Sequence, residues 1–115
     1  MDHKKDIVYL EHMLSCAQRI MKYTNGIDEV SFKEQTILQD AVIRNLEIIG
    51  EATKKLSLHF RSHHSHIPWR QIAGMRDKLI HDYLQVDVPT IWQTVQDVIP
   101  EFSNSLKEII AQEND

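Results

Sequence analysis

The sequence predicts an all-α fold: an antiparallel bundle of four to five helices, formed by residues 1–115 as a single domain. Apolar residues recur at three- and four-residue steps over three long segments, which is the period of an amphipathic helix. No segment shows the two-residue alternation of a half-buried strand. Glycine and proline number only three each, as expected of long helices. Short connections between such helices make neighbours antiparallel, hence a bundle.

The first predicted helix carries an apolar stripe and ends at Asn25-Gly26, because glycine commonly terminates a helix. Cys16 lies within this pattern, and we interpret it as a core residue, since a buried free cysteine behaves as a small hydrophobe. It is the single cysteine, so an intrachain disulfide is excluded. The stripe consists of Ile7, Leu10, Leu14, Ala17 and Met21.

A second helix is predicted to begin at Ser31, because Ser31 and Glu34 have the spacing of a capping box. Gly50 interrupts its stripe, and an isolated glycine is tolerated. Three charged side chains on this helix are spaced as face neighbours and are interpreted as solvated charges or as an ion pair with another helix. They are Arg44, Glu47 and Glu51, and the stripe consists of Leu38, Ala41, Val42, Ile49, Ala52 and Leu56.

The remaining elements follow from prolines and polar stretches. Residues 62–66 are predicted to form a polar loop, and Pro68 then opens a shorter helix that runs to about Tyr83. The last helix is predicted to begin near Asp87, a good N-cap, with Pro89 in its first turn. Pro100 falls inside its apolar pattern and is expected to kink it.

Charge is distributed unevenly along the chain. The net charge of −4 argues against a general nucleic-acid coat, because such proteins neutralise many phosphates. Residues 53–81, however, carry six lysines and arginines against the single acid Asp77, together with five histidines. This basic stretch is compatible with binding a short piece of nucleic acid, and the alternative is a solvated surface. Arg70 and Lys78 are candidate RNA contacts within it.

The location is expected to be cytoplasmic. No apolar run approaches the roughly 20 residues that cross a bilayer, and the first residues lead into no signal-peptide core. Four clustered histidines, His59, His63, His64 and His66, are candidate metal ligands. They lack a cysteine nearby, and we interpret them as part of a polar loop, so no metal or other cofactor is expected.

The segment from Arg76 to Tyr83 concentrates chemically useful side chains. The Arg76 guanidinium suits a phosphate, and His81 can give or take a proton near neutral pH. Asp77 precedes His81 by four residues, so on a helix it could orient the imidazole, while Tyr83 offers a hydroxyl for modification. A cation and a proton shuttle suffice to cleave RNA without metal, because the 2′-hydroxyl is the nucleophile.

Helix geometry complicates this reading. On a straight helix Arg76 and His81 would be roughly 140° apart, whereas Arg76 and Tyr83 would lie within about 20° of each other. Either the helix is distorted near His81, or the groups face a groove walled by a second copy of the chain. The second option predicts a symmetric dimer with a composite site.

The whole chain resembles the HEPN superfamily, specifically the HepT-like toxins that pair with a minimal nucleotidyltransferase (MNT) antitoxin. The family signature of arginine, a polar residue, three further residues and His-x-Tyr stands here as Arg76 to Tyr83. Two upstream stretches, residues 44–52 and 67–75, also match the family in order. Asp77 departs from the asparagine often found at that position, which leaves its role open.

The resemblance implies a helical bundle that dimerises around the motif. It implies a metal-independent endoribonuclease, with Arg76 and His81 catalytic and contributed by both protomers of a homodimer. It also implies a type II toxin that an antitoxin silences by attaching AMP groups to Tyr83, where added phosphates would repel RNA.

Two alternatives remain open at this point. The chain could be a non-catalytic helical module that partners a nucleotidyltransferase and cleaves nothing. A weaker alternative is a small metal-binding bundle that uses the four clustered histidines.

Overall fold

The computed structural model describes residues 3–82 and 85–113, and for residues 3, 80–82 and 85 the description covers the backbone alone. The predicted all-α class is confirmed, with one short pair of strands added. In chain order the elements are α1 (His3–Thr24), α2 (Glu29–Lys33), α3 (Thr36–Lys55), α4 (Leu58–His63), α5 (Trp69–Ala73), α6 (Met75–Leu79), β1 (Ile80–Asp82), β2 (Gln85–Val86), α7 (Val88–Asp97) and α8 (Ile99–Glu113).

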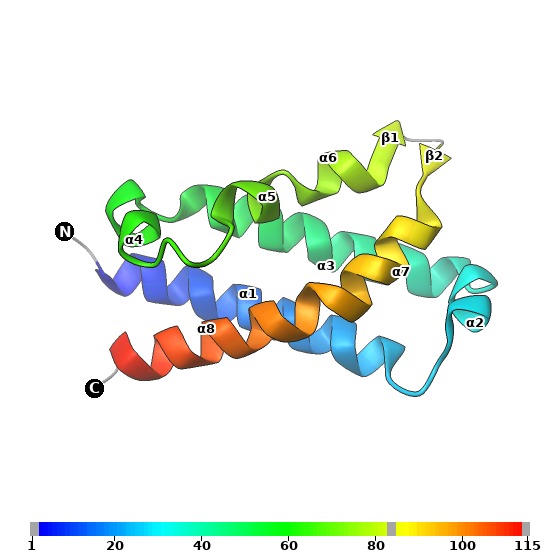
Figure 1. Cartoon of the computed structure of the whole chain (residues 1–115), viewed down its shortest axis with the longest axis horizontal. Coiled ribbons are helices and arrows are strands. Elements are labelled where there is room, and N and C mark those ends of the chain that lie inside the picture. The colour runs from blue at the N-terminus through cyan, green and yellow to red at the C-terminus, as the bar shows by residue number, and fades with distance from the viewer. Residues whose placement is uncertain (1–2, 83–84, 114–115) are drawn as a thin grey trace.

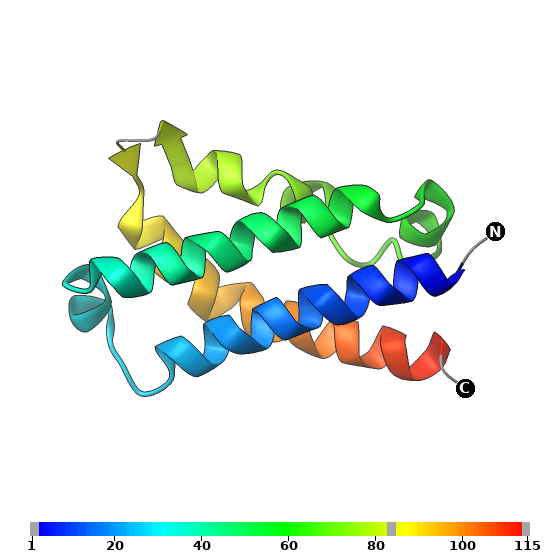
Figure 2. The same cartoon turned by 180° about the vertical axis from the view of Figure 1, so that it is seen from behind.

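The helices form a bundle of four rods (Figures 1 and 2). Helices α1 and α3 are two unbroken rods and pack on each other, while α8 packs on the other side of α1. The third rod is α5 followed by α6, which both lie along α3, and the fourth is α7 followed by α8. The expected bundle is therefore present, with two of its rods each divided into two helices.

One hydrophobic core joins the rods. Helix α1 contributes Leu10, Met13 and Ile20, which are fully buried. Burying an aliphatic side chain of this size contributes about 1.5–3 kcal/mol, so the core supplies the main stabilising free energy of the bundle. The largest fully buried side chains elsewhere are Phe32, Val42, Leu46, Ile49, Phe60, Ile91, Ile99, Leu106 and Ile109.

The connection between the first two long helices differs from the prediction. Helix α1 ends at Thr24 and Gly26 has φ 78°, as expected of a terminating glycine. Ser31, however, lies inside the short helix α2, whose N-cap is Asp28, with the Ser31 amide donating to Asp28 over 2.8 Å. The predicted capping box is therefore wrong, because an aspartate three residues earlier caps first, and α3 begins only at Thr36.

Gly50 is a contact point between two rods as well as an interruption of the α3 stripe. A Cβ atom built at Gly50 would lie 3.2 Å from the carbonyl oxygen of Ala73 at the end of α5. This is tighter than ordinary van der Waals contact, so the absence of a side chain lets the two backbones approach closely. This contact lies just before α6 and fixes the position along α3 at which α6 begins.

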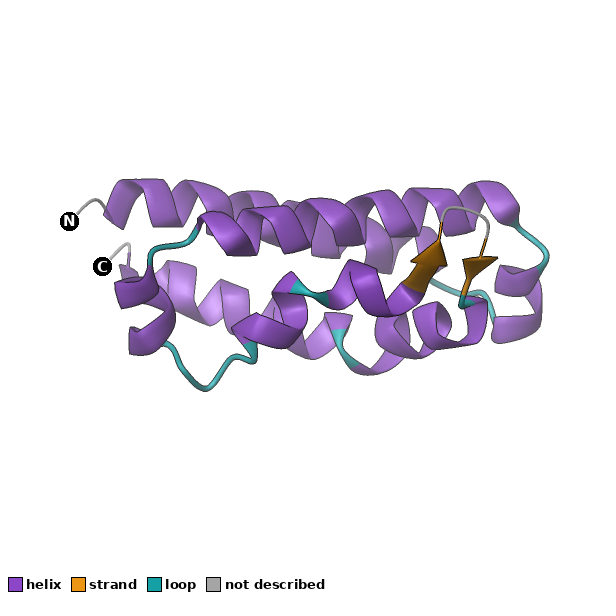
Figure 3. Cartoon of the chain, turned by 90° about the horizontal axis from the view of Figure 1, so that it is seen from above, coloured by secondary structure: helices purple, strands orange, loops and turns teal. Residues whose placement is uncertain are grey.

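The predicted helix from Pro68 to Tyr83 is too long. It breaks at Gly74 into α5 and α6, and α6 ends at Leu79. The chain then forms the antiparallel pair β1–β2, with Ile80 opposite Val86 and an irregular register between Ile80 and Asp82 (Figure 3). The Asp87 amide donates to the Leu79 carbonyl over 2.9 Å and closes the base of this hairpin.

The prediction for the last rod is confirmed. Asp87 is the N-cap of α7, and its side chain accepts from the Thr90 amide over 3.1 Å, with Pro89 in the first turn. The rod is interrupted at Val98, and Pro100 follows in the first turn of α8, where its missing amide hydrogen costs little. No helix in residues 3–82 and 85–113 combines the length and apolar character needed to cross a membrane.

Candidate functional site

Arg76 is fixed to the long helix α3 by an ion pair. Its Nε donates to Glu47 Oε2 over 3.1 Å, and its Nη1 lies 3.5 Å from Asp77 Oδ1. The Arg76 side chain is 49% exposed and the Glu47 side chain 31% exposed, so the pair lies at the surface. A guanidinium has five N–H donors, and the hydrogen bond to Glu47 uses only the one on Nε, so the Nη donors can contact an anion even though Nη1 also lies beside the exposed Asp77 carboxylate.

An open cleft of about 260 Å³ surrounds the Arg76 guanidinium between α3 and the α5–α6 rod. The carboxylates in it have cationic partners: Glu47 pairs with Arg76, and Glu51 lies 3.3 Å from Lys54. The close approach at Gly50 forms the floor, because no side chain separates the two rods there. The lining residues are Glu47, Gly50, Glu51, Lys54, Ala73, Arg76 and Asp77.

His81 lies in β1, two residues beyond the end of α6. Arg76 and His81 are therefore not on one straight helix, and the first of the two geometric options, a break in the helix before His81, holds in the structure. The separation of roughly 140° computed for a continuous helix no longer applies. Tyr83, the predicted modification site, lies outside the described residues.

Asp77 is placed differently from its predicted arrangement. Because α6 ends at Leu79, Asp77 and His81 are not one turn apart on a continuous helix. The Asp77 side chain is 79% exposed and its carboxylate lies beside Arg76. The helical spacing that led us to expect Asp77 to orient His81 is therefore absent. The contact that the structure shows for the Asp77 carboxylate is with Arg76.

The two candidate RNA contacts lie outside the Arg76 cleft. Arg70 on α5 and Lys78 on α6 are both exposed, and neither lines that cleft. Lys78 lines a separate depression with residues of α5 and α7, and Arg70 lines another beside α4. Lys78 is two residues from Arg76 on α6 and so lies on another face of that helix, whereas Arg70 lies on α5, before the break at Gly74.

Glu47 is the site residue that sequence reasoning did not assign. Its spacing from Arg44 and Glu51 was visible, and an ion pair with another helix was one of the two interpretations. The partner could not be read from the pattern, because Glu47 and Arg76 are 29 residues apart and meet only when α6 packs on α3.

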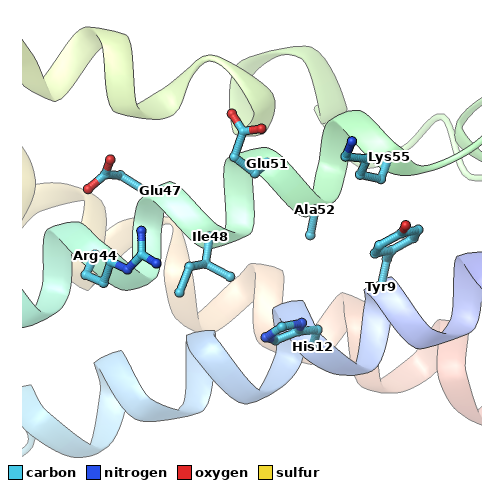
Figure 4. Close-up of a pocket in the computed structure, with 8 residues that line it drawn as sticks. All are labelled: Tyr9, His12, Arg44, Glu47, Ile48, Glu51, Ala52 and Lys55. Atoms are coloured by element: carbon cyan, nitrogen blue, oxygen red, sulfur yellow. The ribbon is translucent and has the colours of Figure 1, made fainter.

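A second cleft, of about 340 Å³, lies between α1 and α3 (Figure 4). Tyr9 and His12 project into it from α1, with Arg44 and Lys55 at opposite ends of the α3 side. It shares Glu47 and Glu51 with the Arg76 cleft, so the two depressions adjoin across the outer ridge of α3. Ile48 and Ala52 form its apolar floor.

The clustered histidines gather at α4, at the opposite end of the α5–α6 rod from the hairpin. The His59 and His63 rings are stacked with centroids 6.1 Å apart, and His64 is buried with its Nε2 3.4 Å from Glu113 Oε1. Among the described residues, no three histidine, cysteine, aspartate or glutamate side chains are arranged to hold a metal ion. His64 therefore belongs to the packing of α4 against α8.

Cys16 is fully buried, which confirms its assignment to the core. Burial raises the pKa of the Cys16 thiol above its ordinary value, and the positive charges of Arg19 and Arg44 offset this only partly. A thiol that is buried and kept protonated is a poor nucleophile.

Comparison with known proteins identifies the family. The model of the ribonuclease HepT-like family matches residues 13–109, and the chain belongs to this family. It is 46% identical over 105 residues to "Putative RNase TTE0752" of Caldanaerobacter subterraneus, which covers 91% of this chain and 94% of that protein. It is 43% identical over 101 residues to "Probable ribonuclease HepT" of Thermococcus cleftensis, with coverages of 88% and 92%. No solved structure gives a significant match.

Membership of this family confirms the resemblance to HEPN ribonucleases and the predicted enzyme class, an endoribonuclease acting on RNA. The matched region contains both stretches of the site, residues 44–52 on α3 and residues 76–81 on α6 and β1.

Proposed function

We propose that the chain is a metal-independent endoribonuclease toxin that cleaves RNA with Arg76 and His81. The observation that carries this proposal is the anchoring of Arg76: Glu47 fixes its Nε over 3.1 Å in an open cleft, five residues before His81. A guanidinium held in this way presents its Nη donors to a phosphate at little entropic cost.

In the proposed reaction the 2′-oxygen of a ribose attacks the adjacent phosphorus. The 2′-O–P bond forms and the P–O5′ bond breaks, which leaves a 2′,3′-cyclic phosphate and a 5′-hydroxyl. His81 moves the protons, taking one from the 2′-hydroxyl or giving one to the leaving 5′-oxygen. Arg76 stabilises the negative charge that builds up on the phosphorane oxygens. Proton transfer and a guanidinium together require no metal ion.

The active form in this proposal is a homodimer. One chain offers a single Arg76 and a single His81, whereas the reaction needs both a proton acceptor and a proton donor. A two-fold axis beside the hairpin would bring two copies of the pair to one cleft, so that one His81 acts as the base and the other as the acid. The site would then be complete only in the dimer.

Regulation by modification completes the proposal. Tyr83 follows His81 by two residues, and a minimal nucleotidyltransferase antitoxin would attach AMP groups to its hydroxyl. Each AMP would add a negatively charged phosphate two residues from His81 in the sequence, and its charge would repel RNA. The chain would thus be the toxin of a type II toxin–antitoxin pair that acts in the cytoplasm, where its RNA substrates are.

The test is cleavage of total RNA by the purified chain in the presence of a chelator, with Arg76→Ala and His81→Ala alongside. Matched controls are Arg19→Ala and His66→Ala, which remove the same residue types from exposed positions outside the cleft. Intact mass establishes that Tyr83 is unmodified. We expect cyclic-phosphate ends from the wild type and both controls, and losses of at least about 100-fold in the two site variants.

Failure of a folded, unmodified wild-type chain to cleave any RNA would overturn the proposal. Cleavage that persists in His81→Ala would overturn the assignment of His81 while leaving the enzyme class intact.

A further inference from the structure

We propose that the groove between α1 and α3 is a second RNA-binding site, which takes the single-stranded RNA on one side of the cleaved phosphate. The inference rests on the proposed function and adds to it a surface on which the substrate would lie. Its lining residues come from two helices that no part of the signature motif includes (Figure 4).

The glutamates of α3 that line the groove are paired with cations, whereas two cations of α3 that line it are not. Glu47 and Glu51 are directed away from α1, towards the α5–α6 rod, and are paired with Arg76 and Lys54 (Figure 4). Arg44 and Lys55 lie at the two ends of the groove, and their side chains make no ion pair or hydrogen bond with other described residues. The carboxylates of this surface are thus largely neutralised, whereas its two outermost cations are available to an anionic partner.

The spacing of these cations suits a polymer with repeated negative charges. Arg44 and Lys55 are 11 residues apart on α3, so they lie within about 20° on one face and about 16 Å apart along the axis. At roughly 3.4 Å per stacked nucleotide, this distance spans about five nucleotides. A single small anion could contact only one of the two cations.

Between the cations the groove offers surfaces for bases. The Tyr9 ring stands on α1 opposite Ala52, and His12 lies one turn further along α1 (Figure 4). Nucleobases stack on tyrosine and histidine rings irrespective of sequence, and an apolar floor of Ile48 and Ala52 accommodates their faces. Two phosphate contacts flanking an aromatic platform are the usual composition of a single-strand site.

The groove adjoins the Arg76 cleft. Both depressions are lined by Glu47 and Glu51, so only the width of α3 separates them. A strand whose phosphate lies on Arg76 can therefore pass over this ridge and continue along the groove towards Tyr9. The site would add affinity for longer RNA without taking part in the chemistry.

The experiment measures binding of a fluorescein-labelled single-stranded RNA of about 12 nucleotides, compared with one of about three, by anisotropy. His81→Ala serves as background to keep the RNA intact, and Arg44→Gln with Lys55→Gln is added to it. The matched control is Lys22→Gln with Lys107→Gln, which removes the same charge from exposed positions outside both clefts.

We expect the parent to gain affinity with RNA length and the Arg44/Lys55 double variant to lose most of that gain, at least about tenfold in Kd. The slope of log Kd against log salt should fall by about 1.4, since each single-strand phosphate contact contributes about 0.7. Tyr9→Leu should weaken binding about tenfold with little change in the slope. The control should change Kd and slope by much less.

Two results would overturn the inference. One is an Arg44/Lys55 variant that binds the longer RNA as the control does. The other is a double variant that becomes monomeric in sedimentation analysis while the control stays dimeric, since the groove would then be a protein–protein interface. A wild type that cleaves RNA in either case would leave the proposed function intact, so the two failures can be told apart.

Discussion

Glu47 holds Arg76 by a single hydrogen bond, from Nε to Oε2 over 3.1 Å, across 29 residues of sequence. We expect Glu47→Ala to lower kcat about tenfold or more while changing KM much less, because a guanidinium that wanders is misplaced in the transition state. Glu47→Gln should recover part of the loss, since its amide oxygen can still accept from Nε. Steady-state cleavage of a short labelled RNA measures both constants.

The opposite result would be equally informative about this pair. If Glu47→Ala raised kcat/KM, Glu47 would be competing with the substrate phosphate for Arg76 instead of positioning it. Glu34→Ala, which removes an exposed carboxylate at the end of α2, is the control for the change in net charge.

Gly50 and Gly74 allow a matched comparison of two glycines. A Cβ at Gly50 would lie 3.2 Å from the Ala73 carbonyl, whereas one at Gly74 would lie 3.6 Å from the Arg70 carbonyl, an ordinary contact. Gly50→Ala gains about 1 kcal/mol of helix propensity but must push two packed backbones apart. We expect a net loss of about 1 kcal/mol in the free energy of unfolding by urea, against little change for Gly74→Ala. A Gly50→Ala chain more stable than the wild type would contradict this account.

Asp6 ties the start of α1 to the start of α4. It is buried and accepts from both the amide and the hydroxyl of Ser57, over 2.9 and 3.0 Å. Asp6→Ala would leave a partly buried amide without its acceptor, so we expect a loss of about 2 kcal/mol in the free energy of unfolding. The control is Glu11→Ala on the exposed side of α1, which should change stability by less than about 0.5 kcal/mol.

Equal effects of the two substitutions would show that the Ser57 contact contributes nothing. The expected difference should appear in the midpoint of urea unfolding with an unchanged slope.

Cys16 predicts a specific pH dependence. Because its pKa is raised in the folded chain above the ordinary 9.0, folding favours the protonated thiol. This contribution to stability is fully present below pH 9 and is lost as the pH rises through the folded-state pKa. The free energy of unfolding of the wild type relative to Cys16→Ala should therefore be constant below pH 9 and decline as the pH rises above 9.

The same burial predicts slow alkylation. Iodoacetamide near neutral pH should label the folded chain on the order of a hundredfold more slowly than the chain in urea. Rapid labelling of the folded chain would contradict the burial of Cys16.

The sequence supports the regular parts of the fold better than the site. The α1 stripe, the glycine at its end and the Asp87 cap were readable because each depends on neighbours in the chain. The Ser31 cap was misassigned because two competing caps, Asp28 and Ser31, stand three residues apart. Local signals cannot rank such alternatives when tertiary packing decides between them.

The end of α6 at Leu79 illustrates the same limit. The sequence between Met75 and Tyr83 contains no glycine or proline that would break a helix, yet α6 ends at Leu79 and β1 follows directly. Arg76 and His81 could be proposed as site residues from the motif, whereas the pairing of Glu47 with Arg76 could not, since it forms only through contact with a distant helix. The difference has a physical reason: a sequence shows which residue types are present, whereas the packing of helices decides which of them are in contact.

The hairpin that carries His81 is pinned at its base. The amide of Asp87 bonds to the carbonyl of Leu79, a buried residue, and Asp87 also caps α7. The hydrogen bond between these two residues therefore closes the base of the hairpin from outside it, since neither residue belongs to β1 or β2. We therefore expect a change in the hairpin's length, or a group attached to it, to leave the packing of the four rods unchanged. The part of the proposed site that lies in the hairpin can therefore change apart from the bundle, whereas Arg76 is tied to the packing of α6 on α3 through Glu47.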